Sequence, residues 1–265
     1  MKIPNPVTDM KVVILAGGLG TRISEESRFK PKPLIEIDDK PILWHIMKIY
    51  SLYGFNDFII CGGYKQNCIK EFFFDLYINN ADVTFDLRNN SIITHHARSE
   101  PWKVTVVDTG LNTMTGGRIK RIREYVGNNT FMVTYGDGVS DIDIGRLVEH
   151  HKAKNKLATI TAIMPGGRFG TMEINDDDDI LSFIEKKKDD GKWINGGFMV
   201  LEPEVFDYVE GDDTVFEKAP LENLAKDGQL TAYKHHGFWQ CMDSMKEREY
   251  LQKLIATGEA PWIRW

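Results

Sequence analysis

The chain has 265 residues, of which 42% are hydrophobic and 27% are charged, and its formal net charge is −6. This composition is typical of a folded globular protein and excludes a disordered or fibrous chain. An acidic chain without a long lysine or arginine run is a poor nucleic-acid binder, and no apolar stretch reaches the about 18 residues that span a bilayer, so we expect neither a nucleic acid nor a membrane as a partner.

The amino-terminal residues 1–9 are polar, contain two prolines and lack the apolar segment of a signal peptide. We expect them to form a loose extension, with Met10 as an alternative start, and residues 10–265 to form a single domain. The three cysteines form no CxxC pair and are expected to be small buried side chains in a reducing compartment, which favours a cytoplasmic location.

Apolar, β-rich runs alternate along the chain with stretches typical of helices. The predicted strands are 11–16, 58–61, 131–135 and 158–163, and the predicted helices are 41–53, 65–76, 143–153 and 245–256. This alternation predicts an α/β fold with a doubly wound, mostly parallel, Rossmann-like sheet and helices on both faces. Short β-rich runs also predict a hairpin excursion over 82–107. A small β-rich part is predicted after residue 164, with strands near 171–175, 180–185, 197–201 and 230–234.

The most informative segment, LAGGLGTR, covers residues 15–22 and directly follows the first predicted strand. Open α/β sheets bind ligands at this carboxyl edge, and its glycines let backbone N–H groups approach an anion. There is no GxxxxGK[ST] P-loop, and the dinucleotide pattern GxGxxG fails because Ile23 occupies its last position. Four cations lie in the proline-containing arm that follows: Arg22, Arg28, Lys30 and Lys32. Together these features favour a polyphosphate site over a solvated surface turn.

Two aspartates follow β-rich segments in distant parts of the chain. Asp137 lies in YGDG, directly after the third buried strand, and Asp243 lies in QCMD, just before the last helix. Two carboxylates from separate segments are sufficient for Mg²⁺ when phosphates supply its other ligands. The alternatives are a turn aspartate for Asp137 and a helix N-cap for Asp243, so neither residue is specific by itself.

Other charged clusters are interpreted as structural. The acidic run 176–179 lies between two predicted strands and is expected to be a solvated hairpin turn. The seven histidines are His45 and three adjacent pairs. Neighbouring side chains diverge in both helices and strands, so no pair forms a chelating site and we expect no zinc.

These motifs resemble the sugar-1-phosphate nucleotidyltransferases, whose signature is an opening strand, an LAGGxGTR loop and a KPK or KP arm. Here the loop is LAGGLGTR and the arm is KPKP at 30–33. The segments VDTGLNTMTGGR, TYGDGVSD and GFWQCMD extend the resemblance to the end of the chain and favour the branch of the family that uses CTP. One departure is KKK at 186–188, where the family usually has a proline after its sugar-phosphate lysine. This leaves open whether Lys186 or Lys187 contacts the phosphate.

The resemblance implies a role for each matching residue. The triphosphate would be held by Gly17, Gly18, Gly20 and Thr21. The base would be flanked by Leu15, Ala16, Asp108, Thr109 and Gly110. The leaving pyrophosphate would be neutralised by Arg22 and Lys32, and Mg²⁺ would be bound by Asp137 and Asp243. The sugar would contact Gly170, Glu185 and Asn195, and its phosphate would contact Lys186.

The implied reaction joins CTP and a sugar 1-phosphate, with glucose 1-phosphate as the acceptor, and releases pyrophosphate. The attacking phosphate is already ionised near pH 7, since its second pKa is about 6, so no general base is needed. Catalysis then requires in-line positioning and neutralisation of charge. Two alternatives stay open: the same chemistry with UTP, dTTP or another phosphorylated acceptor, and a non-catalytic nucleotide-sugar binder. The resemblance further implies a homo-oligomer based on trimers.

Overall fold

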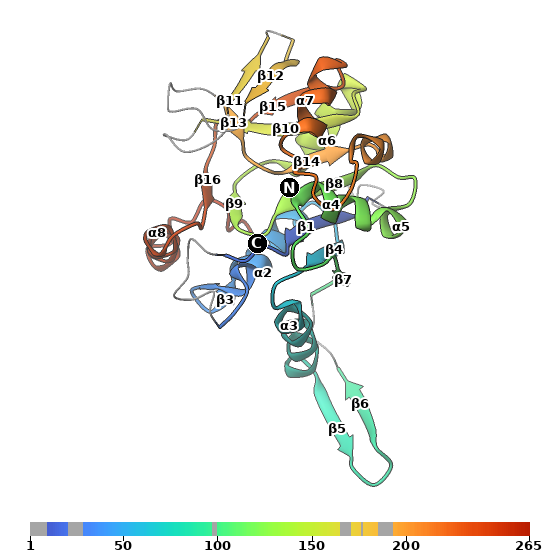
Figure 1. The fold of residues 1–265 in the computed structure, drawn as a ribbon. Helices are drawn as coiled ribbons and strands as arrows, with labels where there is room; N and C mark the ends of the chain where they lie inside the picture. The colour runs from blue at the N-terminus through green and yellow to red at the C-terminus, as the bar shows by residue number, and fades with distance from the viewer. Residues whose placement is uncertain (1–9, 21–28, 97–99, 165–170, 176, 185–192) are drawn as a thin grey trace.

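The computed structural model describes residues 10–20, 29–96, 100–164, 171–175, 177–184 and 193–265. The core of the fold is a central sheet with the strand order β13-β10-β14-β8-β1-β4-β7 (Figure 1). Four neighbouring strands run parallel: β8 (Phe131–Tyr135), β1 (Val12–Ala16), β4 (Asp57–Gly62) and β7 (Lys103–Asp108). The predicted mostly parallel α/β sheet is therefore confirmed.

The other half of the sheet is mixed. Strand β14 (Met199–Leu201) pairs antiparallel with both β8 and β10 (Ala158–Ile163). Strand β10 also pairs with β13 (Ile194–Asn195) antiparallel and with β15 (Leu230–Lys234) parallel. Strands β13, β14 and β15 of the predicted β-rich part after residue 164 thus extend the sheet, whereas β11 (Thr171–Ile174) and β12 (Ile180–Ile184) form a separate hairpin.

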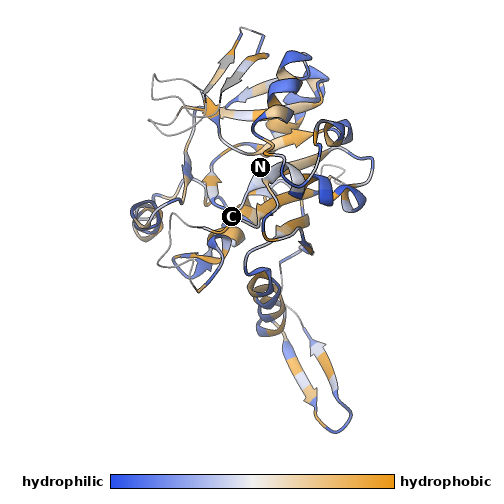
Figure 2. Cartoon of the chain, viewed as in Figure 1, coloured by the Kyte–Doolittle hydropathy of each residue, from blue (hydrophilic) through white to orange (hydrophobic). Residues whose placement is uncertain are grey.

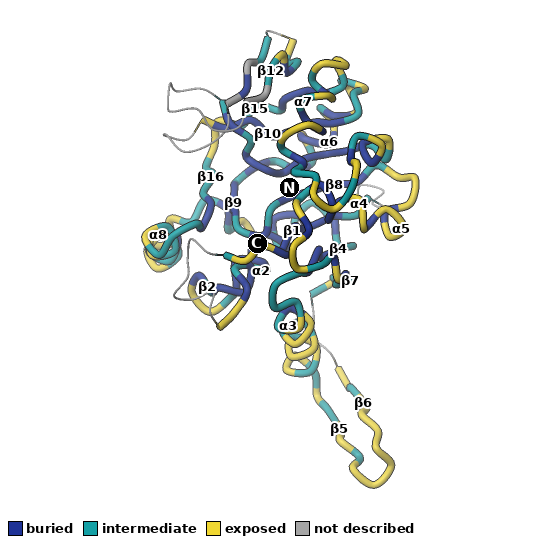
Figure 3. The backbone as a smooth tube through the Cα atoms, viewed as in Figure 1, coloured by how far each residue is buried: buried dark blue, intermediate teal, exposed yellow. Residues whose placement is uncertain are grey.

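Helices cover both faces of the sheet because side chains of each strand alternate between them. In β1, Val12 and Ile14 belong to one buried cluster, whereas Val13 and Leu15 belong to another. The first cluster receives side chains from α2 (Ile42–Ser51), α3 (Gln66–Asn79), α6 (Ile144–Lys154) and α8 (Met245–Ala256). The second receives them from α4 (Thr115–Arg121), α5 (Arg123–Val126), η3 (Pro203–Tyr208) and α7 (Ala219–Lys226). Figure 3 shows these central strands as the buried part of the chain.

The predicted hairpin excursion is shorter than expected. Strands β5 (Asp82–Asp86) and β6 (Ser91–His95) form a hairpin that projects from the body of the protein and carries alternating apolar and polar segments (Figures 1 and 2). The prediction that the excursion continues to residue 107 is wrong, since β7 pairs in parallel with β4 over six residues of the central sheet. The alternation of polar and apolar residues in β7 suits a half-buried edge strand of this sheet as well as a hairpin strand.

Several short elements lie in the connections between the central strands and the helices. They are η2 (Lys32–Leu34), β2 (Glu36–Ile37), β3 (Lys40–Pro41), β9 (Gly138–Ser140) and β16 (Trp239–Cys241). The acidic residues 177–179 lie between β11 and β12, as predicted, but Asp178 and Asp179 are half-buried and form ion pairs with Lys234 and Lys156, so this turn is not simply solvated. Within the described ranges, no helix combines the length and the apolar character that a membrane crossing requires.

Candidate active site

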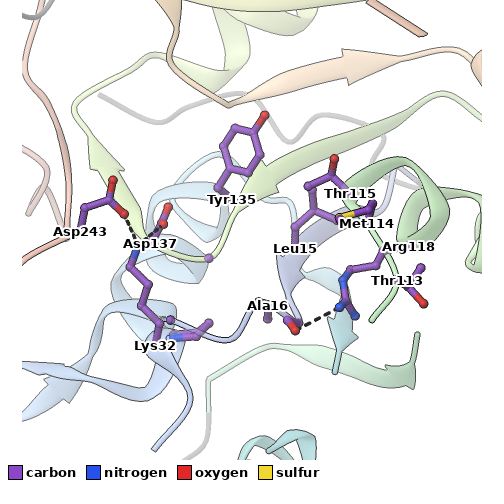
Figure 4. A pocket seen from close by; sticks show the side chains of 15 residues that line it. Leu15, Ala16, Lys32, Thr113, Met114, Thr115, Arg118, Tyr135, Asp137 and Asp243 are labelled. Atoms are coloured by element: carbon purple, nitrogen blue, oxygen red, sulfur yellow. Dashed lines mark hydrogen bonds and ion pairs between the residues drawn. The ribbon is translucent and has the colours of Figure 1, made fainter. Parts of the chain in front are cut away.

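A cavity of about 420 Å³ lies at the carboxyl ends of β1 and β8 (Figure 4). Its walls come from five separate parts of the chain. The lining residues are Leu15, Ala16, Gly17, Gly18, Gly20, Lys32, Pro33, Thr113, Met114, Thr115, Arg118, Tyr135, Gly136, Asp137 and Asp243. A cavity of this size, with a few polar groups aimed into it, is typical of a small-molecule site. Eight residues that the sequence predicts for substrates or metal lie in this lining: Leu15, Ala16, Gly17, Gly18, Gly20, Lys32, Asp137 and Asp243.

The glycine loop starts where β1 ends, and Arg118 of α4 holds it in place. The Nη2 of Arg118 donates a hydrogen bond to the carbonyl oxygen of Gly17 at 3.0 Å. A side chain at Gly17 would overlap the guanidinium, because a Cβ there would lie 2.0 Å from Arg118 Nη1. A Cβ at Gly18 would meet no atom within 4 Å, so this glycine leaves open space beside the cavity.

Arg118 is a buried cation, and its hydrogen bonds to the described residues go to uncharged oxygens. Its acceptors are the carbonyl oxygens of Gly17, Gly62, Gly110 and Leu111 and the hydroxyl of Thr109, at 2.7–3.2 Å. No carboxylate among the described residues forms an ion pair with it. Burial lowers the pKa of Arg118 from its ordinary value, although the group stays charged near neutral pH. Within the described part of the chain, the site therefore contains a fixed positive charge that forms no ion pair with a carboxylate, as an anionic ligand would favour.

The two predicted metal-binding aspartates are brought together by a pair of very short strands. Strands β9 and β16 pair antiparallel with Cys241 opposite Gly138, and the N–H of Met242 donates to the carbonyl oxygen of Asp137 at 2.8 Å. This pairing places Asp243 beside Asp137 (Figure 4). The alternative role of Asp243 as an N-cap is wrong, because Ser244 is the residue that caps α8.

Lys32 lies between these two carboxylates. Its Nζ donates to Asp137 Oδ2 and to Asp243 Oδ1, each at 2.5 Å. Burial lowers the pKa of Lys32, but the charges and hydrogen bonds of both aspartates outweigh burial, so the net pKa is raised above its usual value. The side chain of Lys32 is therefore a protonated ammonium at neutral pH. Its contact with both aspartates shows that their carboxylates can bind the same cation.

The cysteine beside these aspartates is not a nucleophile. Cys241 is buried, and its pKa is raised to about 12 by burial and by the neighbouring charges of Asp137 and Asp243. A thiol with this pKa stays protonated near pH 7, whereas the thiolate is the reactive form. Its buried position agrees with the predicted structural role of the cysteines.

The segment 108–110, predicted to flank a base, does not line the cavity. Thr109 is fully buried and donates to the carbonyl oxygen of Gly62 at 2.6 Å, while its hydroxyl accepts from Arg118. The carbonyl oxygen of Gly110 also accepts from Arg118, and Asp108 is exposed and accepts from the N–H of Gly110 at 2.9 Å. The segment thus binds the guanidinium of Arg118 through Thr109 and Gly110. The residues that line the cavity in this part of the chain are Thr113, Met114 and Thr115.

Asn195, predicted to contact a sugar, is also outside the cavity lining but touches it. Its Nδ2 donates to the hydroxyl of Tyr135 at 3.2 Å, and Tyr135 lines the cavity. Five further predicted residues lie outside the described residues: Thr21, Arg22, Gly170, Glu185 and Lys186, together with the alternative Lys187.

Two functional features were missed by the sequence-based interpretation. Arg118 and Tyr135 lie in segments that carry the family resemblance, but neither received a role. The available signal for Arg118 was an arginine directly after two glycines, in a segment that follows a predicted β-rich run. For Tyr135 the signal was its position at the end of a buried strand, two residues before Asp137.

A divalent cation fits the two carboxylates only if a ligand completes its coordination. No group of three or more histidine, cysteine or acidic side chains among the described residues could hold a metal ion by itself. Mg²⁺ is commonly held by one or two carboxylates together with substrate phosphates and water. Asp137 and Asp243 converge on one cation and therefore suit a metal that arrives with a phosphate-bearing ligand.

Comparison with known proteins gives similarity over nearly the whole chain. The family model described as Nucleotidyl transferase matches residues 11–241. The glucose-1-phosphate cytidylyltransferase of Salmonella typhimurium is 54% identical over 257 residues, which are 97% of this chain and 100% of that protein. The D-glycero-alpha-D-manno-heptose 1-phosphate guanylyltransferase of Campylobacter jejuni is 30% identical over 82% of this chain and 87% of that protein. The crystal structure of HddC from Yersinia pseudotuberculosis shares the fold, with a TM-score of 0.74 at 24% identity over 93% of this chain and 99% of the other.

Proposed function

The chain belongs to the nucleotidyl transferase family, and on this premise we propose that it joins CTP and glucose 1-phosphate to form CDP-glucose and pyrophosphate. The 54% identity to a cytidylyltransferase, over 97% of this chain and 100% of that protein, supports this choice of substrates. The observation that carries the chemistry is the cavity in which a glycine loop, Lys32 and two carboxylates converge.

The reaction is an in-line displacement at phosphorus. The phosphate of the sugar attacks the α-phosphorus of the nucleotide, a new P–O bond forms, and the bond to the pyrophosphate breaks. The attacking group is already anionic near pH 7, so the reaction needs no general base. This agrees with a cavity whose described lining residues include no histidine or cysteine. The side chains must hold two anions together and neutralise the charge that develops on the leaving pyrophosphate.

We assign the charge-neutralising roles to Lys32, Arg22 and Lys186. Lys32 is half-buried beside the carboxylates, within the cavity lining, and can donate to a phosphate oxygen once another cation replaces it there. Arg22 follows the glycine loop in the sequence, where a planar bidentate donor suits a phosphate. Lys186 and its neighbour Glu185 are assigned to the sugar phosphate and the sugar, together with Gly170 and Asn195.

The proposed cofactor is Mg²⁺, held by Asp137 and Asp243. When bound, it would neutralise phosphate charge and hold the reacting phosphates in place. The convergence of both carboxylates on Lys32 supports the assignment, because the same two oxygens can accept a metal ion.

The test is to mix the protein with CTP, glucose 1-phosphate and Mg²⁺ and to look for CDP-glucose by chromatography, with pyrophosphate release measured in parallel. A panel of UTP, dTTP and other sugar phosphates separates cytidylyl transfer from the same chemistry on other substrates. A relative that transfers guanylyl groups shares 30% identity, so base choice needs this direct comparison. Tight binding of CDP-glucose with no turnover in any combination would favour a nucleotide-sugar binder and contradict the proposal.

We also propose a trimer-based homo-oligomer in which the β5–β6 hairpin contacts a second copy of the chain. The hairpin exposes the large apolar side chains Phe85, Leu87, Ile92 and Ile93 at 52–86% of their surface. Apolar groups gathered on a projecting element are typical of an interaction surface. In the carboxyl-terminal tail, Trp262 packs on its own chain, because it is 1% exposed and stacks on Phe238, whereas Trp265 is 39% exposed.

Sedimentation analysis tests this assembly. Phe85 and Ile92 are opposite each other in the hairpin, so replacing both by serine should dissociate the oligomer. Arg88→Ser, in the exposed turn of the same hairpin, is the matched control and should leave the assembly intact. A wild-type protein that sediments as a monomer would contradict the assembly but not the reaction.

The cytoplasm is the proposed location, supported by three free cysteines.

A further inference from the structure

The carboxylate of Glu217 binds two hydroxyl groups that line the cavity from different elements. Tyr135, the last residue of β8, donates to Glu217 Oε1 at 2.6 Å. Thr115, the first residue of α4, donates to Glu217 Oε2 at 2.6 Å. Both hydroxyls belong to cavity-lining residues, whereas Glu217 is not among the residues that line the cavity. One carboxylate therefore fixes the relative positions of two walls of the cavity.

Glu217 is held in place because the preceding segment lies against the amino-terminal part of α4. The N–H groups of Gly116 and Gly117 donate to the carbonyl oxygen of Thr214 at 2.9 and 3.3 Å. A Cβ at Gly116 would lie 2.7 Å from this oxygen, so only glycine permits the approach. Asp212 adds an ion pair with Arg121 at 2.5 Å. The residues before Glu217 are thus attached to the same helix that carries Arg118.

The ring and hydroxyl of Tyr135 are constrained on the opposite side by the loop between β13 and β14. The hydroxyl accepts from Asn195 Nδ2, and Asn195 Oδ1 accepts from the N–H of Gly197 at 2.8 Å. A Cβ at Gly197 would lie 3.1 Å from Tyr135 Cδ2, which shows how closely the loop approaches the ring. The Tyr135 hydroxyl thus donates to Glu217 and accepts from Asn195, and these two hydrogen bonds fix its orientation.

The position of this network in the cavity indicates which substrate it serves. The glycine loop and Arg118 lie at one wall, and Lys32 lies with both aspartates at another (Figure 4). The hydroxyl of Tyr135 points away from the aspartates (Figure 4) and bonds to Asn195 of β13. The wall formed by Tyr135 is therefore available to the acceptor, while the glycine loop is available to the nucleotide.

We propose that Glu217 is a positioning residue that fixes Tyr135 against Thr115 and so shapes the wall that recognises the sugar phosphate. This inference rests on the proposed function, because it assumes that two substrates meet in the cavity. Glu217 acts through the hydroxyl of Tyr135 and does not need to touch either substrate. A carboxylate is required since it accepts from both hydroxyls at once, whereas a carboxamide has only one accepting atom.

The test compares Glu217→Gln, Tyr135→Phe and the double variant by steady-state kinetics. Each single variant should raise the KM for the sugar phosphate by about 10-fold or more, the scale of one hydrogen bond to a charged group. The KM for the nucleotide should change by less than about 3-fold. The double variant should resemble Tyr135→Phe alone, because Glu217 acts on this wall through the hydroxyl that Tyr135→Phe already removes. Glu204→Gln, an exposed residue of η3, is the control and should behave as wild type.

Three results would overturn the inference: equal increases in both KM values, multiplicative effects in the double variant, or a loss of thermal stability with unchanged KM values. Tyr135→Phe keeps the test valid if Glu217→Gln does not fold. The assay uses whichever nucleotide and sugar phosphate the wild-type protein converts. An error in the proposed substrates would then appear in the wild-type panel, and an error about Glu217 would appear only in the ratio of variant to wild type.

Discussion

Replacing Gly17 by alanine should disturb the site through Arg118 and not through the backbone. The φ angle of Gly17 lies outside the left-handed region, so alanine can adopt this conformation. The added methyl would lie 2.0 Å from Arg118 Nη1 and 2.2 Å from its Cζ, and the guanidinium must move away. This movement breaks hydrogen bonds to Gly62, Thr109 and Gly110 that the arginine forms in the native protein.

The magnitude follows from the hydrogen bonds that are lost. A hydrogen bond from a charged donor contributes about 1.5–3 kcal/mol, and the buried acceptors left behind lose their partner. The five bonds of Arg118 share one group and are not additive, so we take about 3 kcal/mol for its displacement. For a chain of this size, this corresponds to a decrease in Tm of about 6–12 °C. Arg118→Ala should have a similar cost, because it removes the same bonds.

A double-mutant cycle by urea denaturation tests this account. When alanine replaces Arg118, the methyl at Gly17 no longer meets the guanidinium, so the double variant should be about as stable as Arg118→Ala alone. The expected coupling is about 3 kcal/mol. Gly18→Ala is the matched control and should leave the free energy of unfolding nearly unchanged, because no atom lies within 4 Å of its added Cβ. Additive effects of the two changes would refute the proposed contact between Gly17 and Arg118.

Further predictions concern charge and pH. Lys32→Ala, Asp137→Ala and Asp243→Ala should each lower turnover by about 100-fold or more, the scale of one lost electrostatic group, and near-normal kinetics would remove that residue from the site. Arg22→Lys should lower kcat/KM, because a planar donor becomes a point charge, and equal kinetics of the two proteins would contradict this. Burial lowers the pKa of His45 from 6.5 to about 4, so the unfolded chain binds a proton that the folded protein excludes between these pH values. Its stabilising effect is complete above pH 6.5 and should fall by up to about 3 kcal/mol as the pH decreases to 4. In urea titrations, His45→Gln should lose this part of the pH dependence, and an identical decrease in both proteins would contradict it.

The central strands were predictable because they are short, apolar and fully buried. The runs that became β1, β8 and β10 are buried on both faces along nearly their whole length, which is typical of strands covered on both sides. The position of β7 was not predictable from its own residues, since the same alternation fits an edge strand and a hairpin. Its register is set by pairing with β4, a contact between residues 46 positions apart in the chain, such as Asp57 and Lys103.

Helix α4 was not predicted because its own residues disfavour a helical conformation. Gly116 and Gly117 each disfavour a helix by about 1 kcal/mol relative to alanine. The helix forms because the glycines allow the segment 212–214 to bond directly to its first turn. The convergence of Asp137 and Asp243 depends in the same way on β9 and β16, which have three residues each and leave no recognisable pattern in the sequence.

The glycines around the cavity show that a local sequence pattern can predict where a site lies, but not which atoms each glycine contacts. Gly17 and Gly63 both face the guanidinium of Arg118, and a Cβ at Gly63 would lie 2.5 Å from Arg118 Nη1. Gly136 faces the carbonyl oxygen of Leu15 and the ring of Pro33, each 3.0 Å from an added Cβ. These three glycines bring chain segments together, whereas Gly18 alone among those named here faces open space. The glycine-rich sequence correctly indicates close contacts at this edge of the sheet. The structure shows that most of these glycines make room for other parts of the protein and not for a ligand. The direct approach of a phosphate is therefore expected at Gly18, on a loop whose shape depends on Arg118.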